Sequence, residues 1–268
     1  MNIEGKVVIV SGSGTGVGAA CIRQFAELGA RVCVNYSRSQ GDAEAVVAEC
    51  LAMGAEVELV KADVASDADC VRMVEAVVGR WGRLDILVNN AAITKKSSAQ
   101  DLSTLSLQDF LDVYSVNVGG AYQMARAAIP HMLAVGGGSI VNVSSNTAFT
   151  GAGTSIAYTS SKGALNALTL ALARSQAPLV RVNAVCPGVI DTRWMGQVHG
   201  AEAHKPLMQR TGASTPMGRV ATPEDVASAV VWLAAGTSFV TGELLTVDGG
   251  LHRLLPLAKP ARQGEATP

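Results

Sequence analysis

Short apolar runs rich in β-branched residues alternate with helical patterns along almost all of this 268-residue chain. Strands are expected at residues 7–10, 31–36, 57–61, 84–89, 139–145, 180–186 and 243–247. Between them, apolar residues recur every three or four positions, as in amphipathic helices. Such alternation is typical of parallel strands joined by right-handed helical crossovers. The sequence therefore predicts an α/β fold, a single doubly wound domain in which a seven-stranded parallel sheet has helices on both faces.

Three segments depart from this rhythm. A long helical region is expected over about residues 105–135, interrupted by a flexible glycine segment at 118–120. Residues 190–219 mix aromatic, apolar and polar side chains without a period, and a loop of this length usually covers a ligand or is disordered. We expect one domain over residues 1–252 that includes this substrate loop, followed by a tail at 253–268 whose last eight residues are mobile.

Composition and charge exclude several classes of function. A content of 49% hydrophobic and 16% charged residues fits a sheet buried on both faces. The formal net charge of -1 indicates neither nucleic-acid binding nor electrostatic attraction to a membrane. No apolar run approaches the roughly 20 residues of a membrane span, and the start shows no signal-peptide pattern. Five scattered cysteines suggest buried thiols in a reducing compartment, the four histidines lack ligand spacing, and we expect a cytoplasmic protein without a metal site.

A glycine-rich turn follows the first expected strand and leads directly into the first expected helix. It reads Ser11-Gly12-Ser13-Gly14-Thr15-Gly16-Val17-Gly18. Glycines let such a turn bend sharply and approach a pyrophosphate, while the helix N-terminus offers unpaired N–H groups to the anion. The strand–turn–helix context favours a dinucleotide site over a plain turn.

Tyr158 and Lys162 are four residues apart in an expected helix and therefore lie on one face. A nearby cation favours the phenolate, so we expect the tyrosine pKa to fall below its usual value of about 10. Ser145, at the end of an expected strand, is placed to hydrogen-bond a carbonyl or alcohol oxygen. Taken alone, the Tyr–Lys pair also fits a solvent-exposed helix face. Behind a dinucleotide turn it indicates proton exchange, whereas Ser144 is expected to point the other way because strand side chains alternate.

These elements, in this order, resemble the short-chain dehydrogenase/reductase family over about residues 4–252. The glycine-rich turn fits the pattern Thr-Gly-x-x-x-Gly-x-Gly with Ser11 in the threonine position, and Asn89-Asn90-Ala91-Ala92 fits Asn-Asn-Ala-Gly except at its last residue. The other matches are Asp63-Val64, Asn117, Ser145, Tyr158, Lys162, Pro187-Gly188, Thr192, Thr241-Gly242 and Val247-Asp248-Gly249-Gly250.

The resemblance implies a Rossmann fold and hydride transfer between a nicotinamide and a carbonyl carbon. In the implied tetrad, Ser145 holds the substrate oxygen and Tyr158 supplies the proton. Lys162 lowers the tyrosine pKa and bonds the nicotinamide ribose, and Asn117 helps to hold a water between this lysine and solvent. The implied cofactor contacts are Gly12, Ser13, Thr15, Gly16, Val17, Gly18, Tyr36, Ser37, Arg38, Asp63, Val64, Asn89, Ala91, Tyr158, Lys162, Pro187, Gly188, Val189, Ile190 and Thr192. For Asn89 a structural role at the strand end is an equal alternative.

The end of the second strand bears on the choice between NAD(H) and NADP(H). NAD sites usually hold an acid there for the ribose hydroxyls, but Tyr36 takes that place here. Arg38, with the hydroxyls of Ser37 and Ser39, is suited to a 2′-phosphate. We therefore expect NADP(H) to be preferred, with NAD(H) possible. The alternative is that Arg38 is a solvated loop charge and that discrimination is loose.

The substrate is less closely defined. The nearest resemblance within the family is to 3-oxoacyl-acyl-carrier-protein reductases and related carbonyl reductases, the former of which dock an acidic carrier through basic residues. The stretches at 134–138 and 175–180 contain no basic residue, which argues against that docking. We expect a small free ketone or alcohol under an apolar lid of Trp194, Met195, Leu207 and Met208, although Lys205 and Arg210 leave an anionic substrate open.

Other readings stay open beside simple reduction. They are a 3-oxoacyl-carrier reductase proper, transient oxidation during an epimerisation or dehydration, and an inactive nucleotide-binding scaffold of the same fold. By resemblance we expect a homotetramer, with a dimer as the alternative, paired through the long helices before and after the fifth strand. Their alanine-rich faces are Ala121, Ala125, Ala128 and Ala164, Ala167, Ala171, which equally fit packing on the protein's own sheet.

Overall fold

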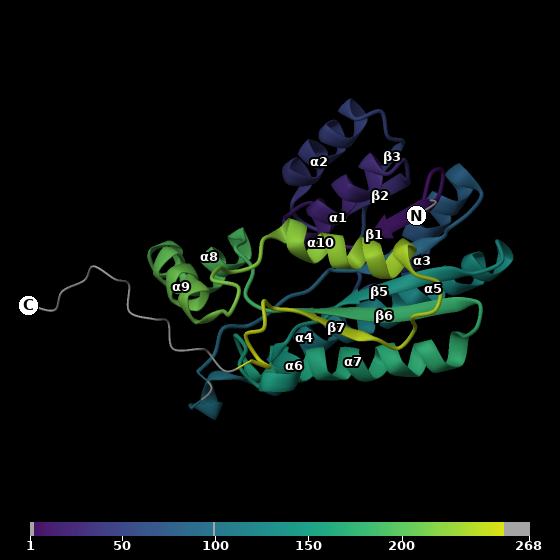
Figure 1. Cartoon of the computed structure of the whole chain (residues 1–268). Helices are drawn as coiled ribbons and strands as arrows, with labels where there is room; N and C mark the ends of the chain where they lie inside the picture. Colours follow the sequence, from purple (N-terminus) through teal and green to yellow (C-terminus); the bar gives the residue numbers. More distant parts are fainter. Residues whose placement is uncertain (1–2, 99, 255–268) are drawn as a thin grey trace, which may run out of the picture.

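The computed structural model describes residues 3–98 and 100–254. Seven parallel strands form one sheet in the order β3-β2-β1-β4-β5-β6-β7 (Figure 1). The strands are β1 (Val7–Val10), β2 (Arg31–Tyr36), β3 (Val57–Lys61), β4 (Ile86–Asn89), β5 (Gly138–Val143), β6 (Val180–Pro187) and β7 (Leu244–Val247). The predicted doubly wound sheet is confirmed. Its order reverses between β1 and β4, which is where ligands bind in open α/β sheets.

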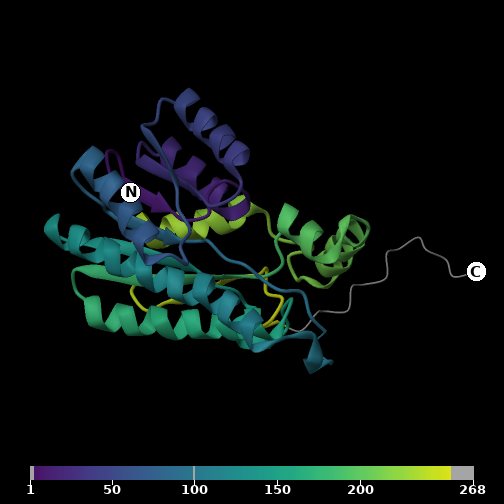
Figure 2. The same ribbon diagram turned by 180° about the vertical axis from the view of Figure 1, so that it is seen from behind.

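Helices cover both faces of the sheet (Figures 1 and 2). One layer holds α1 (Gly16–Glu27), α2 (Gln40–Ala52) and α10 (Pro223–Val231), and the other holds α3 (Asp67–Trp81), α4 (Leu107–Tyr114), α5 (Ala121–Ala134) and α7 (Ile156–Gln176). Side chains of β1 alternate between the two cores, Val8 and Val10 on one face and Val7 and Ile9 on the other. Burial on both faces explains why the strands read as continuous apolar runs.

The region at 105–135 is helical throughout, so the expected interruption at 118–120 was wrong. A π-helical segment, η2 (Ser115–Gly120), joins α4 directly to α5. A Cβ atom on Gly120 would lie 2.7 Å from Cγ2 of Val64. The glycine therefore allows close packing of this helix on the loop after β3 and does not act as a flexible break.

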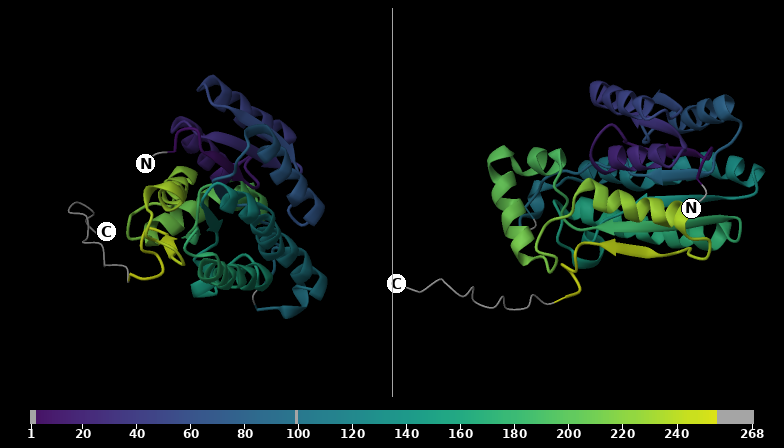
Figure 3. Two further views of the ribbon diagram at one scale, coloured as in Figure 1. Left: turned by 90° about the vertical axis from the view of Figure 1, so that its right-hand side faces the viewer. Right: turned by 45° about the horizontal axis from the view of Figure 1, so that its top comes forward.

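The expectation of an irregular loop at 190–219 was also wrong, because most of it forms helices α8 (Arg193–His199) and α9 (Ala201–Ser214). Figure 3 shows them standing beyond one end of the sheet. Their mixed polarity reflects helices that lie against the protein on one side only. The sequence reading also missed α10, and the expected tail lies outside the described residues from 255 onward. Within the described residues, no helix combines the length and apolarity needed to cross a bilayer.

Candidate active site

A cavity of about 570 Å³ opens at the carboxyl ends of the strands, where the sheet order reverses. Its wall comes from the turn after β1, the ends of β4, β5 and β6, the first turns of α7, and the helices α8 and α9. The position agrees with the general rule for ligand sites in doubly wound folds. Two regions can be distinguished, one around the glycine-rich turn and one around Ser145 and Tyr158.

The glycine-rich turn forms a cradle that side chains would fill. Gly12 has φ +61, and a Cβ there would lie 2.9 Å from Cα of Ala91. A Cβ on Gly18 would lie 2.6 Å from Nδ2 of Asn90. The N-terminus of α1 is not capped by the Thr15 side chain, which leaves its N–H groups available to an anion. The cradle therefore fits the pyrophosphate of a nicotinamide dinucleotide.

Two asparagines fix the shape of this turn. Asn35 Oδ1 accepts a hydrogen bond from the Gly12 amide at 2.9 Å, and the Asn35 amide donates to Ser13 Oγ at 2.9 Å. Asn90 Nδ2 donates to the carbonyl oxygens of Ser11 and Gly12, each at 3.0 Å. Ser13 is fully buried in this role. Its side chain therefore supports the turn from behind and does not line the cavity, unlike the expected direct cofactor contact.

Ser145, Tyr158 and Lys162 line the other region of the cavity. Ser145 lies just beyond β5, while Tyr158 and Lys162 come from α7. Ser155 is the N-cap of α7 and accepts a hydrogen bond from the Tyr158 amide at 3.1 Å, which fixes the tyrosine in the first turn. Ser144 donates to Asn166 Oδ1 at 2.6 Å and so points into α7. The expected division between the two serines is confirmed.

Burial sets the proton affinities of the tyrosine and the lysine, in opposite directions. It raises the pKa of Tyr158 to about 12, against the effect of a hydrogen bond with Ser145. It lowers the pKa of Lys162 to about 8. Lys162 Nζ donates to the Val143 carbonyl at 2.8 Å and lies 5.5 Å from the centre of the Tyr158 ring. The expectation that the lysine lowers the tyrosine pKa below 10 was therefore wrong, because desolvation of both groups outweighs their attraction.

Asn117 and Asn89 both serve the framework of the site. Asn117 lies in η2 and bonds the loop after β4 through Ile93, accepting from its amide at 2.8 Å and donating to its carbonyl at 3.0 Å. Asn89 Nδ2 donates to Asn142 Oδ1 at 2.9 Å and to the Ala121 carbonyl at 3.3 Å. Its side chain is buried and does not line the cavity, so the structural alternative for Asn89 holds and the cofactor contact was wrong.

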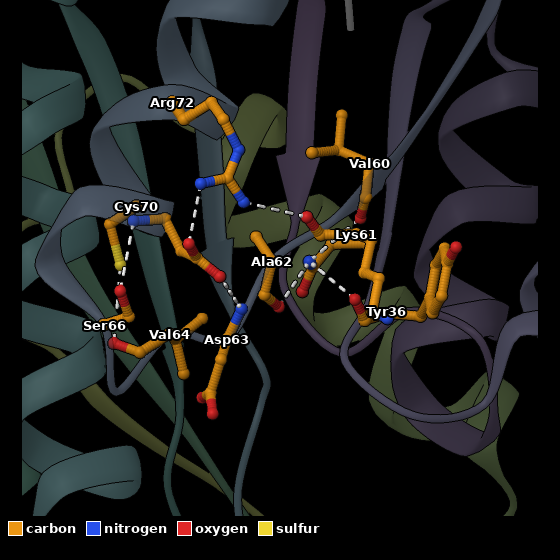
Figure 4. A network of polar contacts seen from close by, with 11 residues as sticks. Tyr36, Val60, Lys61, Ala62, Asp63, Val64, Ser66, Cys70 and Arg72 are labelled. Carbon is orange, nitrogen blue, oxygen red and sulfur yellow. Dashed lines mark hydrogen bonds and ion pairs between the residues drawn. The ribbon is translucent and has the colours of Figure 1, made fainter.

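The residues expected around the adenosine lie at the ends of β2 and β3, along the same edge of the sheet. Figure 4 shows the carboxylate of Asp63 directed away from Arg72, and the ring of Tyr36 directed away from Asp63. The Asp63 amide donates to Asp69 Oδ2 at 2.9 Å, and its Oδ1 accepts from the Ala65 amide at 3.0 Å. Ser37 and Arg38 are exposed, and Val64 is buried against Gly120. This end of the predicted site is an open surface outside the cavity.

The cavity brings together only part of the predicted set. The predicted residues that line it are Gly12, Thr15, Gly16, Val17, Ala91, Ser145, Tyr158, Lys162, Pro187, Gly188, Val189, Ile190 and Thr192. Those that do not are Ser13, Gly18, Tyr36, Ser37, Arg38, Asp63, Val64, Asn89 and Asn117. Residues missed by the sequence reading also line it, namely Asn90, Ala92, Ser144, Asn146, Thr147, Ala152, Gly153, Thr154 and Arg193. Asn90 was recoverable, since a residue adjacent to the inward-facing Asn89 points to the other side.

Comparison with known proteins gives a consistent picture. The family model described as Enoyl-(Acyl carrier protein) reductase matches residues 12–252. Ketoacyl reductase 2 of the granaticin polyketide synthase from Streptomyces violaceoruber is 40% identical over 94% of this chain and 98% of its own length. L-rhamnose 1-dehydrogenase (NAD(P)(+)) from a Sphingomonas species is 36% identical over 93% of this chain and 97% of its own. A solved structure described as a short-chain dehydrogenase/reductase from Burkholderia xenovorans is 36% identical, with a TM-score of 0.86 over 92% of this chain and 98% of its own.

Proposed function

This chain belongs to the short-chain dehydrogenase/reductase family and is an NAD(P)-dependent oxidoreductase; from that premise we propose that it interconverts a small ketone and its secondary alcohol. When bound, the nicotinamide supplies or accepts the hydride. The observation that carries the proposal is the convergence of Ser145, Tyr158 and Lys162 on the cavity that also contains the glycine cradle.

Each of these side chains has a distinct part in the proposal. Ser145 orients the substrate oxygen by a hydrogen bond, and Tyr158, which burial keeps protonated, donates its proton to that oxygen as negative charge develops. Lys162, held by the Val143 carbonyl, sets the electrostatic environment of the phenol and of the nicotinamide ribose. Asn117 keeps its proposed place in the tetrad as a positioning residue that fixes the Ile93 loop beside the cavity.

Tyr158→Phe tests this assignment. The variant removes the proton donor but keeps the ring, which lies 6.3 Å from the ring of Trp194. We expect turnover of a ketone panel to fall by at least ~10³-fold, while fluorescence titration gives an unchanged dinucleotide affinity. Tyr114→Phe, on α4 and outside the cavity, is the matched control and should retain full activity. Near-normal turnover by Tyr158→Phe would remove the tyrosine from its role.

We keep NADP(H) as the preferred cofactor within the proposal. Its support is that Tyr36 ends β2 where NAD enzymes usually place an acid. Arg38 and Ser37 follow it and are exposed at the same edge as the cradle. The nearest acid on α2, Asp42, is engaged by Arg193 through contacts of 2.7 and 3.2 Å. These contacts offset its repulsion of a 2′-phosphate.

The substrate end of the cavity supports an uncharged substrate. Its wall includes Trp194, Met195, Leu207 and Ala152, and Arg193, which also lines the cavity, is paired with Asp42. An apolar wall with a few hydrogen-bonding groups suits a small neutral ketone.

A carrier-bound 3-oxoacyl thioester is the second candidate, favoured by the similarity to a polyketide ketoacyl reductase. The stretches without basic residues at 134–138 and 175–180 precede β5 and β6 and so lie at the opposite end of the sheet from the cavity. The argument drawn from them against carrier docking was therefore wrong. Lys205 and Arg210 are exposed on α9, whose Leu207 lines the cavity. Comparing rates on a free ketone, a short thioester and a carrier-bound thioester separates the two candidates.

Two further alternatives have separate outcomes in the same assays. An inactive scaffold would bind dinucleotide but oxidise and reduce nothing in the panel. An epimerase or dehydratase would change the product without net consumption of reduced nicotinamide. A cytoplasmic location stays a prediction.

Assembly as a homotetramer is part of the proposal. Leu107 and Leu111 of α4 are 76% and 53% exposed, and Leu170 of α7 is 47% exposed. The helices α4 and α7 pack together, so these side chains form a shared apolar surface. Of the expected alanine faces, Ala121, Ala125 and Ala128 are buried within the subunit, whereas Ala167 and Ala171 are exposed. The surface of α4 and α7 is therefore the one we expect a second copy to cover.

A further inference from the structure

The carboxylate of Asp248, which directly follows β7, is buried and accepts four hydrogen bonds. Its Oδ1 accepts from the Gly250 amide at 2.9 Å. Its Oδ2 accepts from the His252 amide at 3.1 Å, from His252 Nδ1 at 2.6 Å and from Asn146 Nδ2 at 3.3 Å. Three of these contacts close the last described turn of the chain on itself. The fourth reaches Asn146, which is next to Ser145 in the cavity wall.

His252 makes a second contact with the same region. Its ring stacks on Phe149 with the centres 5.8 Å apart and the planes at 16°. Phe149 lies in α6 (Thr147–Thr150), the single helical turn that follows Ser145. The Asp248–His252 pair therefore holds the Ser145 turn at two points.

The pair also fixes the end of β6. Gly188 donates its amide to the Val247 carbonyl at 3.0 Å, and a Cβ on Gly188 would lie 2.7 Å from Cβ of Asp248. The Asn146 amide donates to the Pro187 carbonyl at 2.8 Å. Asp248 thus packs behind the two wall segments of the cavity that meet at Asn146 and Gly188.

The contacts of the imidazole define its tautomer. Arg253 Nε donates to His252 Nε2 at 3.2 Å, so Nε2 is the acceptor and Nδ1 carries the hydrogen that Asp248 accepts. A neutral histidine satisfies both contacts. The side chains of His252 and Asp248 are only 11% and 4% exposed, so water competes little for the bond between them.

From this arrangement we propose that Asp248 and His252 are positioning residues for the catalytic serine. Asp248 orients Asn146, His252 orients Asp248 and Phe149, and together they set where the Ser145 hydroxyl stands relative to Tyr158. Neither residue lines the cavity. The inference rests on the proposed function, because it assigns these residues to the serine's part in it. An error of about 1 Å in such a group costs up to ~10²-fold in rate.

The test compares His252→Ala with His252→Asn in the full chain. The alanine removes the bond to Asp248, whereas the asparagine amide can donate in place of Nδ1. We expect His252→Ala to slow hydride transfer in single turnovers by about 10-fold, with dinucleotide affinity and substrate KM unchanged, and His252→Asn to recover most of the rate. Leu251→Ala, in the same turn but outside both contacts, is the matched control.

Equal single-turnover rates for wild type and His252→Ala, or for the alanine and asparagine variants, would overturn the inference. A loss confined to dinucleotide affinity would do the same. If His252→Ala does not fold, Asn146→Ala removes the link from its other end, and it must then slow the chemical step without changing dinucleotide affinity. Failure of the proposed function itself is distinguishable, since the wild-type protein would then reduce no ketone.

Discussion

Replacing Lys162 by methionine should abolish turnover and change how stability depends on pH. Burial lowers the pKa of Lys162 from its ordinary 10.5 to about 8. One pKa unit corresponds to 1.36 kcal/mol, so protonation of this amine costs the folded state about 3 kcal/mol below pH 8. The unfolded chain keeps its proton up to 10.5, so the cost shrinks between pH 8 and 10.5 and is absent above. From about pH 7 to pH 9.5 the wild type should therefore gain about 2 kcal/mol relative to Lys162→Met.

Urea unfolding followed by circular dichroism measures this difference at each pH, at one fixed protein concentration. Every other titrating group is common to the two proteins, so subtracting their free energies of unfolding isolates Lys162. Lys96→Met removes an exposed lysine and should differ from wild type by an amount that does not vary with pH. If the difference between wild type and Lys162→Met is equally constant, the lysine is not desolvated as the structure indicates.

Three shorter predictions concern the cradle, the cofactor and the assembly. Gly18→Ala places a methyl 2.6 Å from Asn90 Nδ2 and should cost about 1–3 kcal/mol of stability with weaker dinucleotide binding, both measurable by thermal shift with and without NADPH; an unchanged Kd would contradict it. Arg38→Ala should weaken NADPH binding by about 10- to 100-fold and NADH binding hardly at all, and equal losses in titrations with both would refute the phosphate contact. Leu107→Glu should reduce the mass found by light scattering to that of a smaller assembly, whereas an unchanged mass would place the interface elsewhere.

Most of the sheet could be predicted from the sequence, and β1, β2 and β3 have the expected limits. Buried parallel strands need apolar side chains on both faces, and such runs are visible in one sequence. The helices of residues 193–214 were not visible, because each contacts the protein on one side only and Gly200, with φ +91, separates them. Helix α10 went unnoticed although Thr222 and Asp225 form a capping box at its start.

Placement of the site followed a similar division. Ser145 and Tyr158 come from segments whose ends meet at one edge of any parallel sheet, so their proximity could be expected. The orientations of Asn89 and Asn90 could not be read off, because a shift of one residue in the strand exchanges their faces. Asn146 gave no signal at all. Its importance comes from Asp248, which lies 102 positions further along the chain.

The proton affinities needed the structure most, and they bear on the direction of the reaction. A tyrosine and a lysine on one helical face suggest a lowered phenol pKa, but only if both remain solvated. Burial instead raises the pKa of Tyr158 to about 12, so the phenol is protonated across the physiological range. A protonated phenol can donate to a ketone oxygen, whereas alcohol oxidation needs it to accept a proton. We therefore expect reduction to be nearly independent of pH from about 6 to 9 and oxidation to accelerate with rising pH. Steady-state rates measured in both directions across that range check this, and an oxidation rate independent of pH would contradict the assignment of Tyr158 as the proton carrier.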